Sequence, residues 1–151
     1  LKIHPFKIPH DAVNPCGFNI FHDDDKISVA TDIGHITSNI AHKLEESKFL
    51  LLEANYDPDV LKCSPYPYLL KQRIAGPNGH LPNVDAGKTI SFLMKSGLSQ
   101  VMLGHLSKEN NFPELAYKTV VETLMENKSD CSKIKISVAN RYNPSPVIKV
   151  S

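Results

Sequence analysis

The sequence has few cysteines, no long apolar run and no initiating methionine. Cys16, Cys63 and Cys131 are odd in number and lack a Cys-x-x-Cys spacing, which argues against a disulfide scaffold and favours partly buried free thiols in a reducing, cytoplasmic compartment. The longest apolar run, Phe49 to Leu52, is far shorter than the roughly 18 residues that cross a bilayer. We therefore expect a soluble protein with no membrane partner, and the opening at Leu1 without a leader indicates an internal start.

An excess of charge and several common active-site motifs are also missing. Seventeen Lys and Arg stand against sixteen Asp and Glu, a formal charge of +1, so a role with nucleic acid, membranes or acidic partners must depend on a local site. No GxGxxG, GxSxG or Gly-Lys-Ser/Thr string occurs, which argues against the corresponding nucleotide cradles and serine hydrolases. With 151 residues, 41% of them hydrophobic, the chain is too short for two ordinary domains and too apolar for disorder.

Apolar periodicity alternates between strand and helix along the chain. The opening segment, from Leu1 to Ile8, is interrupted by Pro5, which predicts a strand near a sheet edge. The run Phe49 to Glu53 is continuous, which is typical of a strand covered on both faces. Further strands are expected over 18–21, 27–30, 100–103 and 134–138, and helices over 38–47, around 60–61, over 68–74, over 83–94 and from 113. Strands that alternate with helices favour an α/β layer structure.

Polar residues and prolines mark the ends of several of these elements. Thr37 or Ser38 is expected to cap the helix over 38–47, and Asn83 is expected to cap the helix over 83–94. Pro113 fits the first position of the last helix. The acidic run 23–25 joins two strands, and we interpret it as a solvated turn rather than a metal site because three adjacent carboxylates repel one another.

Three residues with metal-binding side chains come directly after apolar segments: His10, Asp32 and His105. Because the carboxyl ends of strands in α/β folds are where site residues gather, these side chains can converge. Imidazole and carboxylate suit zinc or another borderline divalent metal, and an aspartate between two histidines suits two metals about 3.5–4 Å apart. Each residue taken singly also fits a hydrogen-bonded structural role, so the residues alone leave both interpretations open.

A fourth histidine, His80, stands just ahead of an expected helix in the string Gly79 to Asn83. Free amides and the helix dipole attract anions there, which suits a residue that steadies or protonates an oxyanion, although a plain turn is the alternative. Asn55 to Asp57 follows a strand and either orients a ligand histidine or forms an Asx turn before Pro58. No ligand role is supported for the other histidines, which are His4, His22, His35 and His42.

Five strings stand in one order along the chain, and together they are far more specific than any one of them. They are 10–11, 31–34, 52–57, 79–83 and 104–111. From about Ile8 to Lys128 this order resembles the C-terminal half of the metallo-β-lactamase-fold hydrolases, in particular their YycJ/WalJ-type branch, which is implicated in DNA processing. The most specific string is Gly-His-Leu-Ser-x-x-Asn-Asn followed by a Pro-Glu-Leu-Ala helix.

The resemblance implies an α/β fold in which residues 1–151 form the C-terminal portion of a single domain, a four-layer αββα sandwich. It implies that His10, Asp32 and His105 are ligands of two divalent metal ions, zinc first, with manganese or iron as alternatives. It also places His80 at a position that contacts the scissile phosphate in tRNA-processing relatives. The implied activity is that of a metal-dependent phosphodiesterase or nuclease with a nucleic acid substrate.

The chain departs from this family in one respect, because the His-x-His-x-Asp-His motif that supplies most ligands of one metal is absent from these residues. Three protein ligands leave two ions short of their usual coordination, so this segment alone is expected to be inactive. We expect a missing N-terminal half to cover an apolar sheet face, or self-association through that face. Two alternatives remain: a non-catalytic half domain that completes a fold by assembly, and a hydrolase of small esters or lactones.

Overall fold

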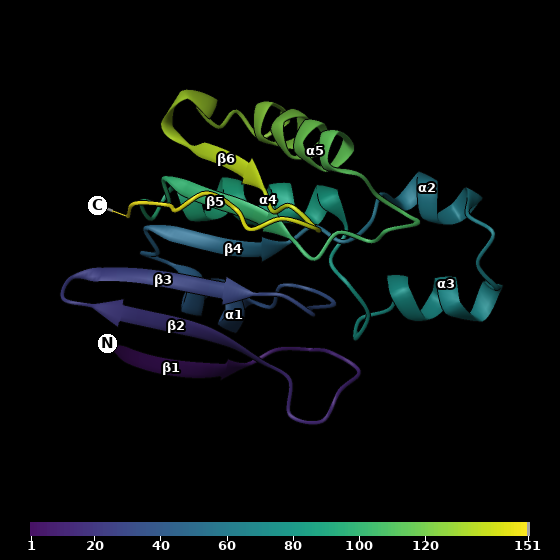
Figure 1. The fold of residues 1–151 in the computed structure, drawn as a ribbon, viewed down its shortest axis with the longest axis horizontal. Helices are drawn as coiled ribbons and strands as arrows, with labels where there is room; N and C mark the ends of the chain where they lie inside the picture. The colour runs from purple at the N-terminus through teal and green to yellow at the C-terminus, as the bar shows by residue number, and fades with distance from the viewer. Residues whose placement is uncertain (151) are drawn as a thin grey trace.

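A computed structural model describes residues 1–150 and contains one six-stranded sheet whose strand order follows the sequence. The first three strands pair antiparallel and the last three extend the sheet in parallel (Figure 1). The expected edge position of the opening strand is confirmed. The strands are β1 (Lys2–Lys7), β2 (Cys16–His22), β3 (Asp25–Ala30), β4 (Phe49–Glu53), β5 (Gln100–Gly104) and β6 (Lys135–Val138).

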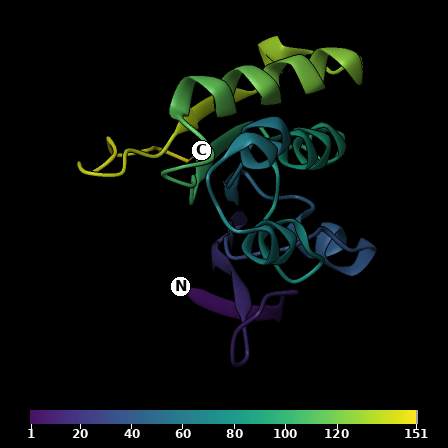
Figure 2. The same ribbon diagram turned by 90° about the vertical axis from the view of Figure 1, so that its right-hand side faces the viewer.

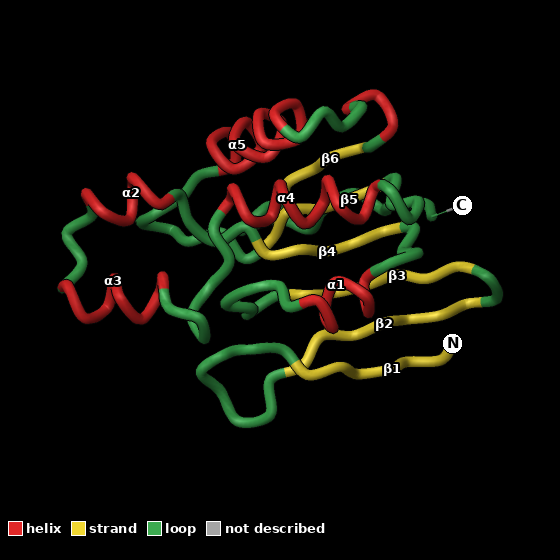
Figure 3. Tube along the Cα trace, turned by 180° about the vertical axis from the view of Figure 1, so that it is seen from behind, coloured by secondary structure: helices red, strands yellow, loops and turns green. Residues whose placement is uncertain are grey.

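The helices lie in two places relative to this sheet. Three of them cover one face, as the views from the side and from behind show (Figures 2 and 3): α1 (Ser38–Leu44), α4 (Asn83–Met94) and α5 (Pro113–Glu126). Two short helices, α2 (Pro58–Cys63) and α3 (Tyr68–Ala75), extend beyond the edge at which the parallel strands end. A 3-10 turn (Cys131–Lys133) precedes β6. Within residues 1–150, no helix combines the length and apolar character that a membrane span requires.

The hydrophobic core lies between the sheet and the three helices that cover it. On β4, Leu50 and Leu52 are completely buried in this core, beside Val101 and Leu103 of β5. The apolar faces of α4 and α5 close it from the other side, with Ile90 among the fully buried side chains. Side chains alternate along a strand, so this core accounts for only half of each strand's residues.

The second face of the sheet carries apolar side chains but no helix. Phe49 and Leu51 of β4 are only half-buried, so the prediction that this strand is covered on both faces is wrong for the described residues. The register aligns two apolar rows across this face, and its outer members Ile3 and Phe18 are 58% and 39% exposed. We call this surface the bare face because no helix covers it; its rows are Ile3, Ile20, Ile27 and Phe49, and then Phe18, Val29, Leu51 and Met102. At its β5 end Met102 is buried, and the C-terminal segment crosses in front of β5 (Figure 1).

The helix ends agree with the sequence in two cases and differ in one. The Thr37 hydroxyl accepts a hydrogen bond from Ile40 N at 3.2 Å, and Pro113 is the first residue of α5, as predicted. The predicted Asn83 cap is wrong, because Pro82 holds the cap position and Asn83 is the first helical residue. The Asn83 amide is buried and its donor and acceptor are both used by Asn111.

Two smaller expectations concern surface residues. The acidic turn is confirmed as solvated at its tip, where the Asp23 side chain is 89% exposed. The three cysteines are free, also as expected, but Cys16 and Cys63 are exposed rather than partly buried. Cys16 is the first residue of β2, and Cys63 is the last residue of the short helix α2; neither side chain reaches the core.

Candidate functional site

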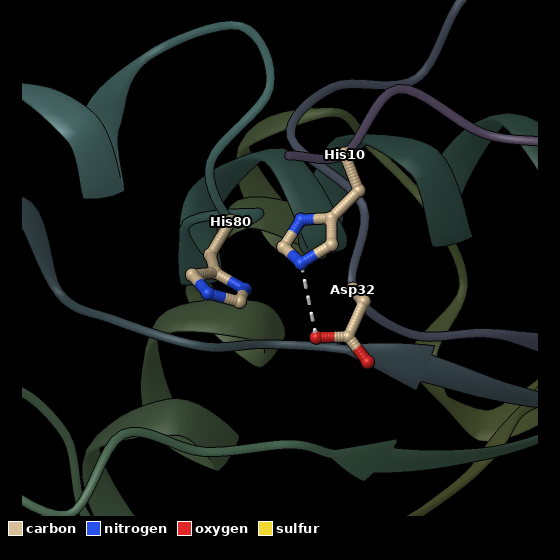
Figure 4. A group of neighbouring side chains, drawn as sticks. All are labelled: His10, Asp32 and His80. Atoms are coloured by element: carbon tan, nitrogen blue, oxygen red, sulfur yellow. Dashed lines mark ion pairs between the residues drawn. The ribbon is translucent and has the colours of Figure 1, made fainter. Parts of the chain in front are cut away.

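The three predicted ligand residues meet at the carboxyl edge of the sheet. β1, β3 and β5 all point the same way, so the segments that follow them reach one end of the molecule. His10 Nε2 lies 3.5 Å and His105 Nε2 lies 3.6 Å from Asp32 Oδ1. His80 joins them, with its ring centroid 5.0 Å from that of His10 and 5.2 Å from that of His105. Figure 4 shows His10, Asp32 and His80 directed toward one another.

A buried carboxylate, Glu53, fixes two of the histidine rings. Its Oε1 accepts hydrogen bonds from His80 Nδ1 at 2.7 Å and from His105 Nδ1 at 2.8 Å, and its Oε2 accepts one from Ile33 N at 2.7 Å. Burial raises the pKa of Glu53, but the hydrogen bonds from His105, His80 and Ile33 together lower it below its ordinary value. The carboxylate is therefore charged, and it can orient both rings at once.

The hydrogen bonds of the histidines determine which ring nitrogen is available. His10 Nδ1 lies 3.0 Å from the carbonyl oxygen of Gly79, which can only accept, so Nδ1 carries the proton. The same argument applies to His80 and His105, whose Nδ1 atoms donate to Glu53. When each ring is neutral, Nε2 therefore keeps its lone pair. A histidine that donates through one nitrogen to a carboxylate or carbonyl is typical of a metal ligand.

The donor atoms are close enough to share a cation. One donor atom each from His10, Asp32 and His80 lies within 4.8 Å of the others, and so does one each from Glu53, His80 and His105. The second trio is better explained as a positioning carboxylate with two histidines, because the oxygens of Glu53 already accept three hydrogen bonds. The donor set with free electron pairs is therefore His10, Asp32, His80 and His105.

The hydrogen bond to Glu53 also changes the electrostatics of His105. That bond raises the pKa of His105, partial burial opposes it, and the charges of Glu53 and Asp32 add to the increase. The guanidinium of Arg141 acts in the opposite direction, which shows that a cation from the segment after β6 stands near this ring. His105 is thus the histidine whose protonated form the site favours when no metal competes for Nε2.

Two of the donor residues have unusual backbone conformations. Asp32 and His105 both have φ of 54°, in the left-handed region that non-glycine residues rarely adopt. Hydrogen bonds on either side hold them there: Ile33 N donates to Glu53, and Asn55 Nδ2 donates to the carbonyl oxygen of His105 at 2.7 Å. Residues in strained backbone conformations of this kind cluster at functional sites, where contacts with the surrounding structure maintain the conformation.

A buried amide network supports the loop that carries His105. Asn111 Nδ2 donates to the carbonyl oxygens of Ala54 at 2.9 Å and Asn55 at 3.1 Å, and to Asn83 Oδ1 at 2.8 Å. These bonds join the end of β4, the start of α4 and the loop after β5. Of the two interpretations of residues 55–57, both hold in part, since Asn55 binds the His105 backbone and Asp57 caps α2 through the amides of Asp59 and Val60.

Close backbone approach places His80 and its neighbours. A Cβ on Gly79 would lie 2.1 Å from the carbonyl oxygen of Ile74, so only glycine fits between α3 and the site. A Cβ on Gly34 would lie 2.2 Å from the carbonyl oxygen of Pro77. The contact of Gly34 brings the loop before α4 against the loop after β3. The loop after β1 joins them through hydrogen bonds from His10 Nδ1 to the Gly79 carbonyl and from Asp11 N to the Asn78 carbonyl.

The remaining histidines lie outside this cluster, and one residue was missed by the sequence reasoning. None of His4, His22, His35 and His42 belongs to a metal-capable group within residues 1–150. Glu53 was not singled out, although an acidic residue at the end of an apolar, buried strand is the signal that marks it. Asn111 gave no such signal, because its role depends on three distant partners.

Comparisons with known proteins bear on the family and the fold of the chain. No protein-family model matches the chain. The exodeoxyribonuclease WalJ of Streptococcus pneumoniae is 36% identical over 126 residues, which cover 83% of this chain and 47% of WalJ. The exodeoxyribonuclease YycJ of Bacillus anthracis is 28% identical over 126 residues, covering 83% of this chain and 48% of YycJ. The chain therefore spans about half the length of the curated relatives it matches.

Solved structures show the same fold at low sequence identity. The metallo-β-lactamase fold protein YhfI of Bacillus subtilis superposes with a TM-score of 0.56 at 14% identity, covering 91% of this chain and 46% of YhfI. Zn²⁺-bound PqqB of Methylobacterium extorquens gives a TM-score of 0.55 at 9% identity, covering 90% of this chain and 44% of PqqB. The chain thus has the fold of about half of a metallo-β-lactamase-fold protein, and the predicted resemblance to the WalJ/YycJ exodeoxyribonucleases is confirmed.

Proposed function

We propose that the protein containing this chain is a metal-dependent phosphodiesterase of the exodeoxyribonuclease type. The observation that carries the proposal is the arrangement around Asp32, whose Oδ1 lies 3.5 Å and 3.6 Å from the Nε2 atoms of His10 and His105. Each of these rings donates its hydrogen bond through Nδ1, so that in the neutral ring Nε2 can offer its lone pair to a borderline divalent cation. The WalJ and YycJ relatives are named exodeoxyribonucleases, which supports DNA as the substrate.

We propose that His10, Asp32 and His105 would hold two divalent ions, with zinc as the first candidate. Divalent ions in such a site activate water near neutral pH and stabilise charge on a phosphate. The residues of this chain do the positioning. Glu53 holds the ring of His105 and directs Nε2 outward, and Gly79 does the same for His10 through its carbonyl.

We assign His80 to the substrate phosphate rather than to a metal. It lies between the rings of His10 and His105, and Glu53 fixes it in the same way as His105. A protonated imidazole can donate to a phosphate oxygen or to the leaving group, and the hydrogen bond from Nδ1 to Glu53 directs Nε2 of His80 away from that carboxylate. The geometry also permits metal ligation by Nε2, so the assignment depends on the experiment below.

We further propose that residues 1–151 form the C-terminal portion of one αββα domain, completed by a sheet from outside this chain; Ser151 lies outside the described residues. Three ligands are too few for two ions, and no His-x-His-x-Asp-His string is present to add more. The bare face is apolar over two rows and carries no helix within residues 1–150; the segment after β6 reaches over its β5 end, where Gln100 Nε2 donates to the carbonyl oxygen of Lys149 at 3.3 Å. A second sheet packed on it would be the ordinary solution for a sandwich. The same face supports the alternative of a non-catalytic half domain that assembles with another chain.

The test is an end-labelled DNA digestion by the longest natural protein that contains this chain, with its metal content measured in parallel. We expect release of nucleotides from a DNA end in Zn²⁺ or Mn²⁺, and about two ions per protein. His80→Ala should keep both ions and lose roughly 10²–10⁴ in rate, the scale of a general acid or oxyanion contact. Loss of metal in that variant would make His80 a ligand. Stable protein with no metal and no hydrolysis of DNA or of small esters would favour the assembly-only role.

A further inference from the structure

A cavity of about 520 Å³ lies directly beside the candidate site. It is lined by residues 105–108 and 111–113 of the loop after β5 and by residues 138–142 of the segment after β6. His105 belongs both to the cavity wall and to the donor set around Asp32. A molecule bound in this cavity would therefore continue directly into the site.

The walls of the cavity are held together by hydrogen bonds. Ala139 N donates to the carbonyl oxygen of Leu103 at 2.8 Å, which continues the pairing of β6 with β5 by one residue. Asn140 Oδ1 accepts from the backbone N atoms of Tyr142 at 2.9 Å and Asn143 at 3.1 Å, so the turn that presents Tyr142 is fixed. The Arg141 guanidinium donates to the carbonyl oxygen of Leu106 and joins the two walls.

The chemistry of the lining is aromatic and basic. Phe112 and Tyr142 are 52% and 79% exposed, although large aromatic side chains usually find cover. Lys108 and Arg141 supply two cations, and none of the lining residues is acidic. In a chain with a formal charge of only +1 this is a local concentration of positive charge. Arg141 uses one donor on Leu106, which leaves further N–H groups of its guanidinium for a ligand.

We propose that this cavity binds the unpaired nucleotide next to the scissile phosphate of a DNA strand, with its base on Tyr142, which is the more exposed of the two rings, and its phosphates on Lys108 and Arg141. Exposed aromatic rings beside cations are the usual means of holding single-stranded nucleic acid. The base must be unpaired, because a base inside a duplex already stacks on its neighbours. The proposal rests on the proposed function, since it names the part of a DNA substrate that lies beside the metal site.

The experiment measures binding separately from cleavage. The longest natural protein containing this chain is titrated, in EDTA, against a fluorescent thymidine oligonucleotide, and Kd is obtained from fluorescence anisotropy over a series of salt concentrations. Tyr142→Ala should weaken binding about 5- to 100-fold, whereas Tyr142→Phe keeps the ring and should stay close to wild type. Arg141→Gln should reduce the slope of log Kd against log salt by about 0.7. Lys133→Gln, whose side chain is 76% exposed at the opposite end of β6, is the matched control and should change neither value.

Each outcome distinguishes this proposal from the proposed function. An unchanged Kd in Tyr142→Ala and an unchanged slope in Arg141→Gln, at wild-type melting temperatures, would overturn the cavity assignment. If Tyr142→Ala weakens the binding of a blunt duplex as much as that of the thymidine oligonucleotide, the requirement for an unpaired base is overturned. If the wild-type protein binds a uridine oligonucleotide more tightly than the thymidine oligonucleotide, DNA as the bound strand is overturned. If Tyr142→Ala weakens binding but the protein hydrolyses no DNA with any divalent metal, the proposed function fails and the cavity assignment stands. If DNA is hydrolysed and both variants keep the wild-type kcat/KM and Kd, the proposed function stands and the cavity assignment fails.

Discussion

The middle and the edge of one sheet face differ in a way that defines this molecule. Phe49 and Leu51 of β4 point to the bare face and remain half-buried, with no helix over them. Glu53, two residues further along the same strand, is completely buried beneath the loops that carry the histidines. The same face is therefore apolar and open at its centre but polar and closed at its carboxyl edge. The edge is thus organised within this chain, and the open centre is the surface on which we propose that another layer packs.

The strongest test of the closed edge is Asp32→Ala in the complete protein. Removal of the carboxylate between His10 and His105 should lower metal content and reduce the rate of DNA hydrolysis by roughly 10³-fold, because the ions supply several kcal/mol of charge stabilisation. Mass spectrometry of bound metal and a digestion assay measure both effects. Asp11→Ala is the control, because Asp11 is next to His10 but pairs with Arg73 on the surface. Metal content equal to wild type in Asp32→Ala would contradict the assignment.

The contrast between the two faces of β4 is tested by a pair of adjacent leucines. Leu52→Ala opens a cavity in the helix-covered core and should cost about 2–5 kcal/mol of unfolding free energy. If a second sheet covers the bare face in the complete protein, Leu51→Ala should cost more than about 2 kcal/mol as well. Urea unfolding of both variants gives the comparison. A cost below about 1 kcal/mol for Leu51→Ala in the complete protein would show that the bare face stays open.

Glu53→Gln tests whether the buried carboxylate positions the histidines. An amide has one acceptor oxygen and cannot supply the charge that stabilises two donating imidazoles, so we expect metal affinity to fall by about 10- to 100-fold. Competition with a chelator of known affinity measures this loss. Glu114→Gln, on the surface at the start of α5, is the control for the change from carboxylate to amide. Wild-type affinity in Glu53→Gln would mean that the rings are positioned without the charge.

The smallest expected effect concerns a helix that covers the closed core. Thr37→Ala removes the side-chain cap of α1 and should lower the unfolding free energy by about 1 kcal/mol. Ser38→Ala at the next position is the control, since Ser38 is the first helical residue and not the cap. Equal effects of the two substitutions in thermal unfolding would show that the cap contributes nothing specific.

Much of the fold follows from local patterns in the sequence. The features that local patterns fail to predict are those that depend on partners far away in the sequence. Thr37 and Pro113 act within one helical turn, so capping rules identify them. Asn83 matches the same rules but fails as a cap, because its amide is bound by Asn111, 28 residues away. The continuous apolar run of β4 predicts cover on both faces, yet the sequence cannot say whether that cover comes from this chain or from another.

The candidate site shows the same division. His10, Asp32 and His105 are predicted as ligands because each follows an apolar strand and matches an ordered family pattern. Their convergence required only that β1, β3 and β5 share one direction. Glu53 was missed because its importance comes from two histidines that approach it from 27 and 52 residues away. A charged residue that is fully buried becomes visible as functional only when its partners are known.

The position of Glu53 on the same side of β4 as Leu51 has a thermodynamic consequence. A layer that packs on the bare face would end beside the proposed metal site and would be in place to add ligands to it. If the proposal holds, metal binding and assembly of the domain are linked equilibria, in which each increases the affinity of the other by the same factor. The melting temperature of the complete protein should therefore depend on free metal concentration, and a chelator should loosen the layers as well as stop the reaction.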